Sequence, residues 1–390
     1  MNGEVDEESS LVDINETAIF LNLSKAKVRK LIERNIIRNN WGQYTNLIRF
    51  TKKVSHIEEG SVLNYSDANL EIIRGFPKIR RCLLLEPALK KNFSSVDEVA
   101  VEEKMNGYNV RAAQINGDII AFTRGGLVCP YTTEKVNELI DPTFFEDYPN
   151  LILCAEMVGP DNPYVAKTCY DVNSLDFFVF DIREKNSGEP YPVKKRRETL
   201  EAYKIKQVNL FGYFKPKDAH KEITKIINEI GSEEREGVVV KDPEMILQPM
   251  KYTTSNSNCK DLEFGFKFYN DIGRDYLFSR VIREGFQAAE WNENNQKLKD
   301  RCYRVGSSIL YPMVNTINSV GKNKKVTEDA QIKVTRLEVL DLFKQHLNRS
   351  GIEVLFEEPI PEEDGYIVKM KKLNKSTNDK TESIWLGDYW

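Results

Sequence analysis

The segment EKMNGYNVR at residues 103–111 places a lysine where a charged side chain gains little structurally. Lys104 follows the apolar run at 99–101 and precedes Asn106-Gly107, a dipeptide typical of hairpin turns. By itself this K-x-N-G pattern favours a solvated lysine at a surface turn. A lysine amine can also act as a nucleophile, but only when its surroundings favour the unprotonated form, because its ordinary pKa is about 10.4.

Further charged and aromatic residues follow Lys104 in a pattern that suits phosphate chemistry. A carboxylate inside an otherwise apolar strand is costly unless it has a partner, so Glu156 in LILCAEMVG is a candidate functional residue. Lys241 and Lys251 could neutralise phosphate charge, although each alone is reasonably explained as a solvated strand end. The set comprises Lys104 in K-M-N-G, Arg124 in T-R-G-G, Glu156, Phe178 and Phe180 in F-V-F-D, Glu236 and Lys241 in E-G-V-V-V-K, and Lys251 in M-K-Y.

Strands must position these side chains. Short β-branched or aromatic runs bounded by turn residues dominate the chain from residue 100 to residue 267. Between them, helical spacing predicts helices at 194–203 and 219–230. The predicted class is therefore α+β, with a mostly antiparallel sheet. The strands are predicted at 110–115, 118–123, 151–158, 176–182, 237–241 and 264–268.

The segments on either side of residues 100–267 show a different sequence pattern. At the N-terminal side, two short helices within 15–38 are joined at 22–24, and Ser24 is placed to cap the second. Such a pair could read DNA, but it is more often a plain packing unit. Strands are predicted at 47–50, 62–65, 354–356 and 366–369, helices at 276–286, 296–318 and 332–348, a linker at 319–330, and a helix stop at Ser350-Gly351.

Composition limits the classes of protein. The chain has 390 residues and a net charge of −4, which argues against coating nucleic acid through bulk positive charge. Its 6 cysteines contain no C-x-x-C pair and only 3 histidines accompany them, so a zinc site or a disulfide framework is not expected. No apolar stretch is long enough to span a bilayer, and the start MNGEVDEESS is acidic and polar. We expect a cytoplasmic protein with no membrane partner.

The ordered motifs resemble those of the covalent nucleotidyltransferases, the superfamily of ATP-dependent ligases and mRNA capping enzymes. The resemblance covers about 74–267. Within it, K-x-N-G-Y-N followed by T-R-G-G is similar to RNA ligases, and GFPKIRR, EKMNGYNVR and MKYTT followed by YNDIGRDYL most resemble the archaeal homodimeric ATP-dependent RNA ligases. This implies an N-terminal domain (1–72), a nucleotidyltransferase domain with an ATP-grasp-like antiparallel sheet (73–270), a helical dimerisation domain (271–325) and a small C-terminal domain (326–390).

The resemblance also implies a role for each motif residue. Lys104 would be covalently adenylylated, with Lys241 and Lys251 as its catalytic partners at the α-phosphate. Glu156 and Glu236 would bind a metal, Mg²⁺ or else Mn²⁺, since carboxylates and phosphates suit its oxygen preference. The implied ATP-binding residues are Glu103, Lys104, Met105, Asn106, Asn109, Arg111, Arg124, Glu156, Phe180, Glu236, Val238, Lys241 and Lys251, with Phe178 as the alternative to Phe180, and the implied RNA-binding residues are Arg124, Arg80 and Arg81.

The predicted function is an ATP-dependent RNA ligase that joins 5′-phosphate and 3′-hydroxyl ends, including the two ends of one strand, as a homodimer. Two departures bear on this. Asn106 stands where most of the superfamily has Asp, and no R-x-D-K-like motif follows residue 267, as DNA ligases and capping enzymes would require. The alternatives are a DNA ligase or capping guanylyltransferase, or a non-catalytic nucleic-acid-binding regulator that uses residues 15–38.

Overall fold

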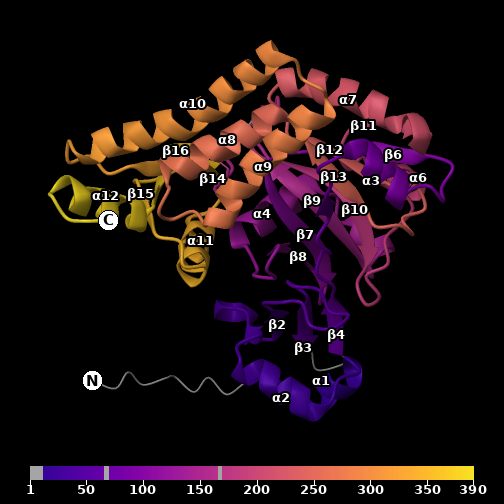
Figure 1. Ribbon diagram of the computed structural model, residues 1–390. Coiled ribbons are helices and arrows are strands. Elements are labelled where there is room, and N and C mark those ends of the chain that lie inside the picture. The colour runs from indigo at the N-terminus through magenta and orange to yellow at the C-terminus, as the bar shows by residue number, and fades with distance from the viewer. Residues whose placement is uncertain (1–11, 66–69, 166–168) are drawn as a thin grey trace.

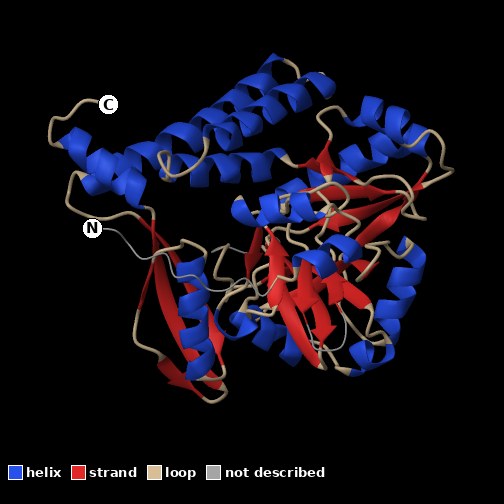
Figure 2. Ribbon diagram, turned by 90° about the horizontal axis from the view of Figure 1, so that it is seen from below, coloured by secondary structure: helices blue, strands red, loops and turns tan. Residues whose placement is uncertain are grey.

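The computed structural model describes residues 12–65, 70–165 and 169–390 (Figure 1). An N-terminal domain lies at one end, two sheets form the centre, and long helices together with a C-terminal sheet domain lie at the opposite side. Helices surround the strands of the two central sheets (Figure 2). No helix among these residues is both long and apolar enough to cross a membrane.

The N-terminal domain packs two helices on a four-stranded sheet. The helices are α1 (Ile14–Phe20) and α2 (Lys25–Glu33), and the Ser24 hydroxyl caps α2 as predicted. The sheet order is β1-β2-β3-β4, and its strands at 47–50 and 62–65 are confirmed. The second helix ends at residue 33 rather than 38, because Asn35 takes a positive φ of 54° and β1 begins soon after. The strands are β1 (Ile37–Asn39), β2 (Leu47–Phe50), β3 (Val62–Tyr65) and β4 (Leu70–Ile73), with a short 3-10 helix at Gly42–Tyr44.

The first central sheet has the antiparallel order β10-β9-β7-β8. Its outer face forms one hydrophobic core with α4, α5 and the C-terminal helix α11. The strands are β7 (Tyr108–Ile115), β8 (Asp118–Thr123), β9 (Leu151–Val158) and β10 (Asp176–Glu184), and the covering helices are α4 (Pro130–Leu139), α5 (Thr143–Asp147) and α11 (Leu337–Arg349). The predicted strands in this region are confirmed.

The second central sheet has the order β11-β6-β12-β13-β5, antiparallel except for the parallel pair β13 and β5. Its outer face packs against α3 and α7. The elements are β5 (Arg80–Arg81), α3 (Leu85–Asn92), β6 (Val99–Lys104), α6 (Val193–Ala202), β11 (Leu210–Phe214), α7 (Pro216–Ser232), β12 (Gly237–Lys241) and β13 (Met250–Thr253).

The alternation of side chains in this second sheet decides which residues face the first sheet. Val99 and Val101 of β6 point outward into the core with α7, so Glu102 and Lys104 point inward. Val238 and Val240 of β12 likewise point outward, which turns Lys241 inward. A one-residue shift in any of these strands would exchange the apolar and charged faces, and burial of the apolar face therefore fixes the register.

The C-terminal half corrects two predictions. Residues 264–268, predicted as a strand, form the end of α8 (Ser255–Lys267), because Thr254 caps a helix whose Cys259 and Leu262 are buried at helical spacing. The predicted linker at 319–330 and helix at 332–348 are also revised. Strand β14 (Thr327–Val334) occupies part of both and pairs along its whole length with β17, so α11 begins only at Leu337.

The remaining elements complete a helical region and a small C-terminal domain. The predicted long helices are confirmed as α9 (Arg274–Glu290) and α10 (Asn295–Val320). The predicted stop after α11 is also found, because Gly351 takes a positive φ of 71°. The C-terminal elements are β15 (Val354–Phe356), β16 (Ile360–Glu362), β17 (Gly365–Leu373) and α12 (Lys375–Trp385).

Candidate active site

A cavity of about 280 Å³ lies between the inner faces of the two central sheets. A larger, more open hollow of about 670 Å³ lies among α3, α7 and the start of α10, but it contains none of the predicted catalytic residues. We therefore take the smaller cavity as the candidate active site. It is lined by Phe76, Ile79, Glu102, Glu103, Lys104, Met105, Gly107, Asn109, Arg124, Glu156, Phe180, Val208, Val239, Lys241 and Lys251.

Three neighbouring strands of the second sheet bring the lysines together. Lys104 ends β6, Lys241 ends β12, and Lys251 lies on β13 beside Val239 of β12. The Lys104 amine lies 2.5 Å from a carboxylate oxygen of Glu236, the residue that directly precedes β12. The prediction that these motifs, far apart in the chain, meet at one place agrees with the structure.

Lys251 has few favourable partners in this pocket. Burial, together with the nearby cations Lys104 and Arg81, lowers the pKa of Lys251 to about 8, while Glu236 opposes them. A pocket that contains more cationic side chains than carboxylates to pair with them is suited to bind an anion such as a nucleotide phosphate.

The Glu102 carboxylate holds the base of the pocket and was not predicted. It forms an ion pair with Lys241, at 2.8 Å, and with both nitrogens of the fully buried Arg196. Burial alone would raise the pKa of Glu102, but Lys241 and Arg196 lower it to about 2. Lys241 also donates a hydrogen bond of 2.6 Å to the carbonyl of Phe180, which links the two sheets. The sequence signal was available, because Glu102 lies two residues before Lys104 and so shares its face.

Glu156 faces Lys104 from the other sheet. Burial raises the pKa of Glu156 to about 7, with a smaller contribution from Glu236, whereas Lys104 lowers it. One carboxylate oxygen accepts a 3.1 Å hydrogen bond from the backbone N–H of Gly107. This close approach also explains the glycine of K-x-N-G, since a Cβ at position 107 would lie 2.1 Å from the carbonyl oxygen of Met157.

Asn109 gives a test of whether the pocket suits a metal ion. It lies directly opposite Glu156 across β7 and β9, and its side-chain oxygen is buried with no hydrogen-bond partner. The described residues include no group of three or more His, Cys, Asp or Glu side chains that could hold a metal. The donors present, Glu156, Glu236 and Asn109, fit an ion such as magnesium, which takes its remaining oxygens from phosphate and water.

Phe180 rather than Phe178 lines the cavity. A bulge between Val179 and Asp181 lies at this point of β10. The Phe180 ring packs edge-on against Phe76, with ring centroids 5.1 Å apart. Both rings pack against a small cluster of Met105, Val158 and Val208, but only Phe180 also lines the cavity. The structure thus favours Phe180 as the aromatic surface for a base.

Two predicted nucleotide contacts do not reach the cavity. Arg111 is completely buried, and its guanidinium donates hydrogen bonds to the carbonyls of Gly60, Arg74 and Thr123. It shares a face of β7 with Asn109, but the N-terminal domain covers that end of the sheet, so Arg111 joins the two domains. Val238 points into the core against α7 because of the strand alternation. We leave both out of the candidate site.

The other predicted residues lie at its edges. Glu103 and Met105 line the cavity, whereas the Asn106 backbone N–H donates to the Tyr170 hydroxyl. Arg124 is exposed at the mouth. Arg81 lies beside Lys251 in the sheet, and Arg80, one residue earlier, is exposed.

Comparisons with known proteins agree with this architecture. The family described as RNA ligase matches residues 97–253, and the family described as ligase Pab1020 C-terminal region matches residues 264–388. An uncharacterized protein of Methanocaldococcus jannaschii, MJ0414, is 37% identical over 98% of both chains. The solved structure of an archaeal ATP-dependent RNA ligase, form 1, is 39% identical, covers 97% of this chain and 100% of its own, and superposes with a TM-score of 0.92. The chain belongs to the archaeal ATP-dependent RNA ligase family.

Membership in the archaeal ATP-dependent RNA ligase family confirms the predicted α+β, nucleotidyltransferase-type fold. The likeness includes the N-terminal and C-terminal domains, because nearly the whole of each chain is covered. A candidate ATP-dependent DNA ligase from Aquifex aeolicus is also similar, at 26% identity over 94% of this chain and 100% of its own, with a TM-score of 0.87. The fold alone therefore does not separate RNA from DNA as the substrate.

Proposed function

We propose that the protein joins RNA 5′-phosphate and 3′-hydroxyl ends through an AMP group carried on Lys104. The observation that supports this most directly is the position of Lys104, which pairs with Glu236 and lines a cavity that also presents two further lysines, three glutamates and two aromatic rings. An isolated surface lysine would not need such surroundings. Membership in the family supports the use of ATP and of an RNA substrate.

The reaction consists of three phosphoryl transfers. First, the unprotonated Lys104 amine attacks the α-phosphorus of ATP, a P–N bond forms, and pyrophosphate leaves. Second, an oxygen of the RNA 5′-phosphate attacks the same phosphorus, the P–N bond breaks, and Lys104 regains its amine. Third, the RNA 3′-hydroxyl attacks the 5′-phosphate phosphorus, loses its proton, and AMP leaves.

The motif residues in and beside the pocket have the following roles in this scheme. Lys241 lies on the strand next to that of Lys104, and Lys251 lies on the strand beyond it. Both would bind the α-phosphate, where they stabilise the charge of the transition state. Phe180 would stack on the adenine, and Arg124 at the mouth would bind a nucleotide phosphate or the RNA end. Glu156, Glu236 and Asn109 would hold magnesium or manganese, which supplies additional neutralisation of phosphate charge when bound.

Glu236 also orients the nucleophile before ATP arrives. Its carboxylate holds the Lys104 amine at 2.5 Å, and the glycine that follows brings the two strands close together. A Cβ at Gly237 would lie 2.2 Å from the carbonyl oxygen of Tyr252, so another residue there would push β12 and β13 apart. The E-G pair of the motif thus fixes both the partner of Lys104 and the distance to Lys251.

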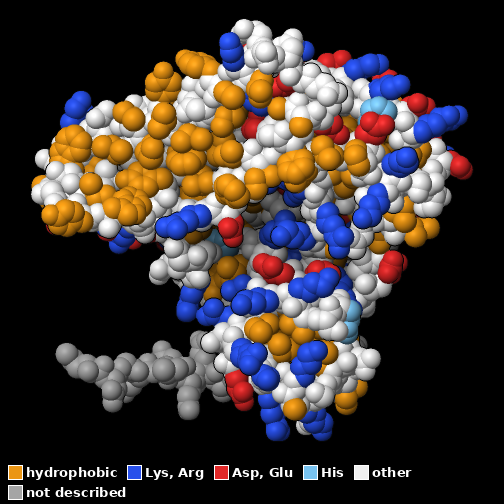
Figure 3. Space-filling model, in the orientation of Figure 1, with side chains coloured by type: hydrophobic (Ala, Val, Ile, Leu, Met, Phe, Trp, Pro, Cys, Tyr) orange, Lys and Arg blue, Asp and Glu red, His pale blue; other side chains and the backbone are white. Residues whose placement is uncertain are grey.

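We also propose a homodimer, since large apolar side chains are exposed together on α10 and the C-terminal residues. Figure 3 shows an extensive hydrophobic area over α10 and the neighbouring C-terminal region. An area of this extent on a water-facing surface usually marks a contact with another protein. The exposed side chains are Tyr303, Leu310, Tyr311, Val314, Trp385, Leu386, Tyr389 and Trp390. Sedimentation equilibrium of the wild type beside a Leu310→Glu variant tests this.

The experiment that tests the function uses ATP radiolabelled at the α-phosphate, without RNA. We expect label to remain on the denatured wild-type protein and to be absent from Lys104→Ala. Incubation with GTP in place of ATP, and with DNA ends in place of RNA ends, separates an RNA ligase from a capping enzyme or a DNA ligase. A regulator that binds nucleic acid through α1 and α2 would show no labelled lysine.

A further inference from the structure

Two arginines lie beside the candidate active site and form no ion pair within the described residues, although Glu236 and Asp261 lie near enough to act on their charge. Arg81 is the register partner of Lys251 in the parallel pair β13 and β5, so it extends the cationic inner face by one strand. Arg283 of α9 lines a small recess together with Arg81, Thr253 and Asn258. The path from Lys104 through Lys251 to Arg81 and Arg283 therefore leads out of the cavity toward α9.

The hydrogen bonds of these arginines leave their charge uncompensated. Arg81 donates to the Thr253 hydroxyl at 2.7 Å, and Arg283 donates to the Asn258 side-chain oxygen at 3.3 Å. Both acceptors are neutral, and within the described part of the chain neither arginine forms an ion pair. The nearby Arg280 differs, because it pairs with Asp261 at 2.8 Å and stacks over Tyr276.

The electrostatic environment agrees with the geometry. Burial, together with repulsion from Arg81 and Arg280, lowers the pKa of Arg283 to about 10, although Asp261 and Glu236 oppose this. Burial likewise lowers the pKa of Arg81. Two half-buried cations that repel each other would be relieved by a bound anion, and the planar guanidinium is well suited to phosphate oxygens.

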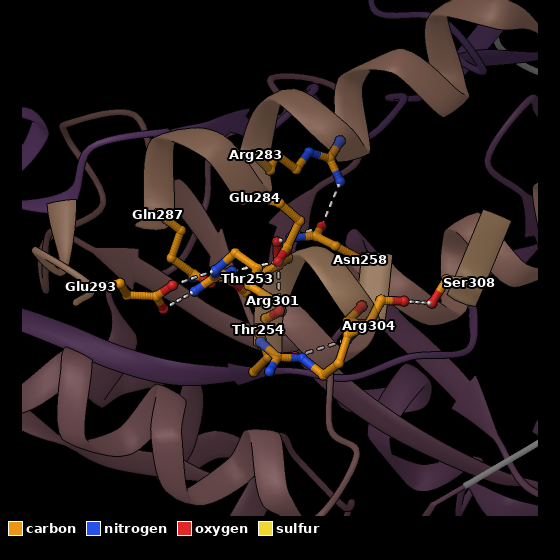
Figure 4. Close-up of polar contacts among 12 residues, drawn as sticks. Thr253, Thr254, Asn258, Arg283, Glu284, Gln287, Glu293, Arg301, Arg304 and Ser308 are labelled. Carbon is orange, nitrogen blue, oxygen red and sulfur yellow. Dashed lines mark hydrogen bonds and ion pairs between the residues drawn. The ribbon is translucent and has the colours of Figure 1, made fainter. Parts of the chain in front are cut away.

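A buried cluster behind the recess holds Arg283 in place (Figure 4). Arg301 of α10 binds Glu284, Gln287 and Glu293, and Gln287 donates a 3.1 Å hydrogen bond to the carbonyl of Thr253 at the end of β13. The helix is thereby fixed on the strand that carries Lys251. Figure 4 shows Arg283 outside this cluster, directed toward Asn258.

We propose that Arg81 and Arg283 bind backbone phosphates of the RNA strand whose 5′-phosphate receives AMP. This rests on the proposed function, since the second transfer requires that 5′-phosphate to enter the cavity beside Lys104. The rest of that RNA strand must then leave the cavity past Arg81 and Arg283, the cations that lie outward from Lys251. In the second sheet, β5 lies three strands away from β6. Because neighbouring strands are about 4.8 Å apart, Arg81 is on the order of 15 Å from the strand of Lys104. This places Arg81 further along the sheet than an α-phosphate bound at Lys104.

The test separates RNA binding from chemistry by using the full chain and two assays. Arg81→Gln, Arg283→Gln and the double variant are compared with wild type for self-adenylylation by ATP without RNA. Binding of a single-stranded RNA with a pre-adenylylated 5′ end is then measured by fluorescence anisotropy at several salt concentrations. The control is Arg274→Gln, an exposed arginine of α9 that lies nine residues away and therefore on the opposite side of the helix.

We expect self-adenylylation by Arg283→Gln to change less than about twofold, while Arg283→Gln and Arg81→Gln each weaken RNA binding about tenfold at low salt. The slope of log affinity against log salt concentration should fall by about 0.7 for each arginine and about 1.4 for the double variant. Arg283→Lys should retain part of the affinity, and Arg274→Gln all of it.

Three results would overturn the proposal. Unchanged affinity and salt slope would mean that the arginines do not touch RNA, as would a wild type that does not bind the adenylylated RNA. A loss of self-adenylylation equal to the loss of RNA binding would instead assign them to the pyrophosphate end of ATP. Failure of the wild type to label Lys104 would count against the proposed function but would leave the binding measurement valid.

Discussion

Two buried groups of charged residues lie within the same part of the molecule, and they are balanced differently. In the Arg301 cluster, one guanidinium is enclosed by Glu284, Glu293 and Gln287, and Glu284 also accepts hydrogen bonds from Ser255 and Asn258. In the candidate active site, Asn109 has a buried oxygen without a partner, and the pKa values of Glu156 and Lys251 are displaced toward their neutral forms. The polar groups of the first arrangement have partners, whereas the second leaves a buried oxygen without one, as the proposed ligand site would require.

The difference separates structure from function more clearly than burial does. Arg301 and Lys241 are both almost inaccessible, and both have carboxylate partners. Arg301 also lines the larger hollow, but its carboxylate partners raise its pKa against the effect of burial, whereas burial lowers the pKa of Lys251 in the candidate site. Displaced pKa values at a cavity are typical of functional sites, while closed ionic clusters are typical of structural ones.

The largest effect is expected at the nucleophile. Lys104→Ala should abolish labelling by ATP, because the proposed mechanism assigns the P–N bond to this amine alone. Lys104→Arg should do the same, although it keeps the positive charge. The measurement is retention of the α-phosphate label on denatured protein. Labelling of either variant at a wild-type level would move the nucleophile to another residue.

A large effect on stability is expected when the closed cluster is opened. Arg301→Met leaves Glu284 and Glu293 buried without their shared cation, which should lower the stability of α9 by about 3–5 kcal/mol. Hydrogen exchange of the α9 amides measures this loss.

A surface ion pair provides the control for that change. Lys225→Met removes the exposed pair with Glu222, which should cost less than about 1 kcal/mol. Equal exchange of the α9 amides in wild type and Arg301→Met would show that the cluster does not support the helix.

A smaller effect on substrate affinity is expected at the aromatic wall. Phe180→Ala removes a ring that lines the cavity and should raise the KM for ATP in self-adenylylation about tenfold, given roughly 1.5 kcal/mol for an aromatic stacking contact. Phe178→Ala is the matched control, since that ring lies two residues away and packs on the same small cluster but does not line the cavity. A greater increase in KM for Phe178→Ala would reverse the assignment.

The smallest expected effect is the pH dependence that Glu156 imposes. Because burial raises its pKa to about 7, the carboxylate that would bind metal is half protonated at that pH. Self-adenylylation should therefore rise about twofold between pH 7 and pH 8 and fall about fivefold from pH 7 to pH 6.

The same group makes a separate prediction for stability. Between pH 4.5 and 7 the folded protein keeps a proton on Glu156 that the unfolded chain has lost, so stability decreases as pH rises through this range. Glu156→Gln should remove that part of the decrease, as measured by denaturant unfolding at several pH values. A decrease of the same size in the variant would assign it to other groups.

Much of the fold could be predicted because the local patterns and the tertiary structure agree. The run at 151–158 contains apolar residues on both faces and is a central strand, as predicted. Prediction failed where an apolar run fits two periods. Residues 264–268 have aromatic residues at alternate positions, but Thr254 begins a helix that continues through them. Strand β14 was missed because its stability comes from pairing with β17, which lies more than 30 residues away.

The sequence alone determined which residue types are available for chemistry, whereas the pairing of β6, β12 and β13 placed Lys104, Lys241 and Lys251 on one face. It could not determine what covers that face. Arg111 and Asn109 have the same alternation, yet one is enclosed by the N-terminal domain and the other opens into the cavity. Likewise, only the packing of α9 on β13 brought Arg283 beside Arg81. Side-chain direction along a strand is a local property, whereas burial depends on contacts between segments that are distant in the chain.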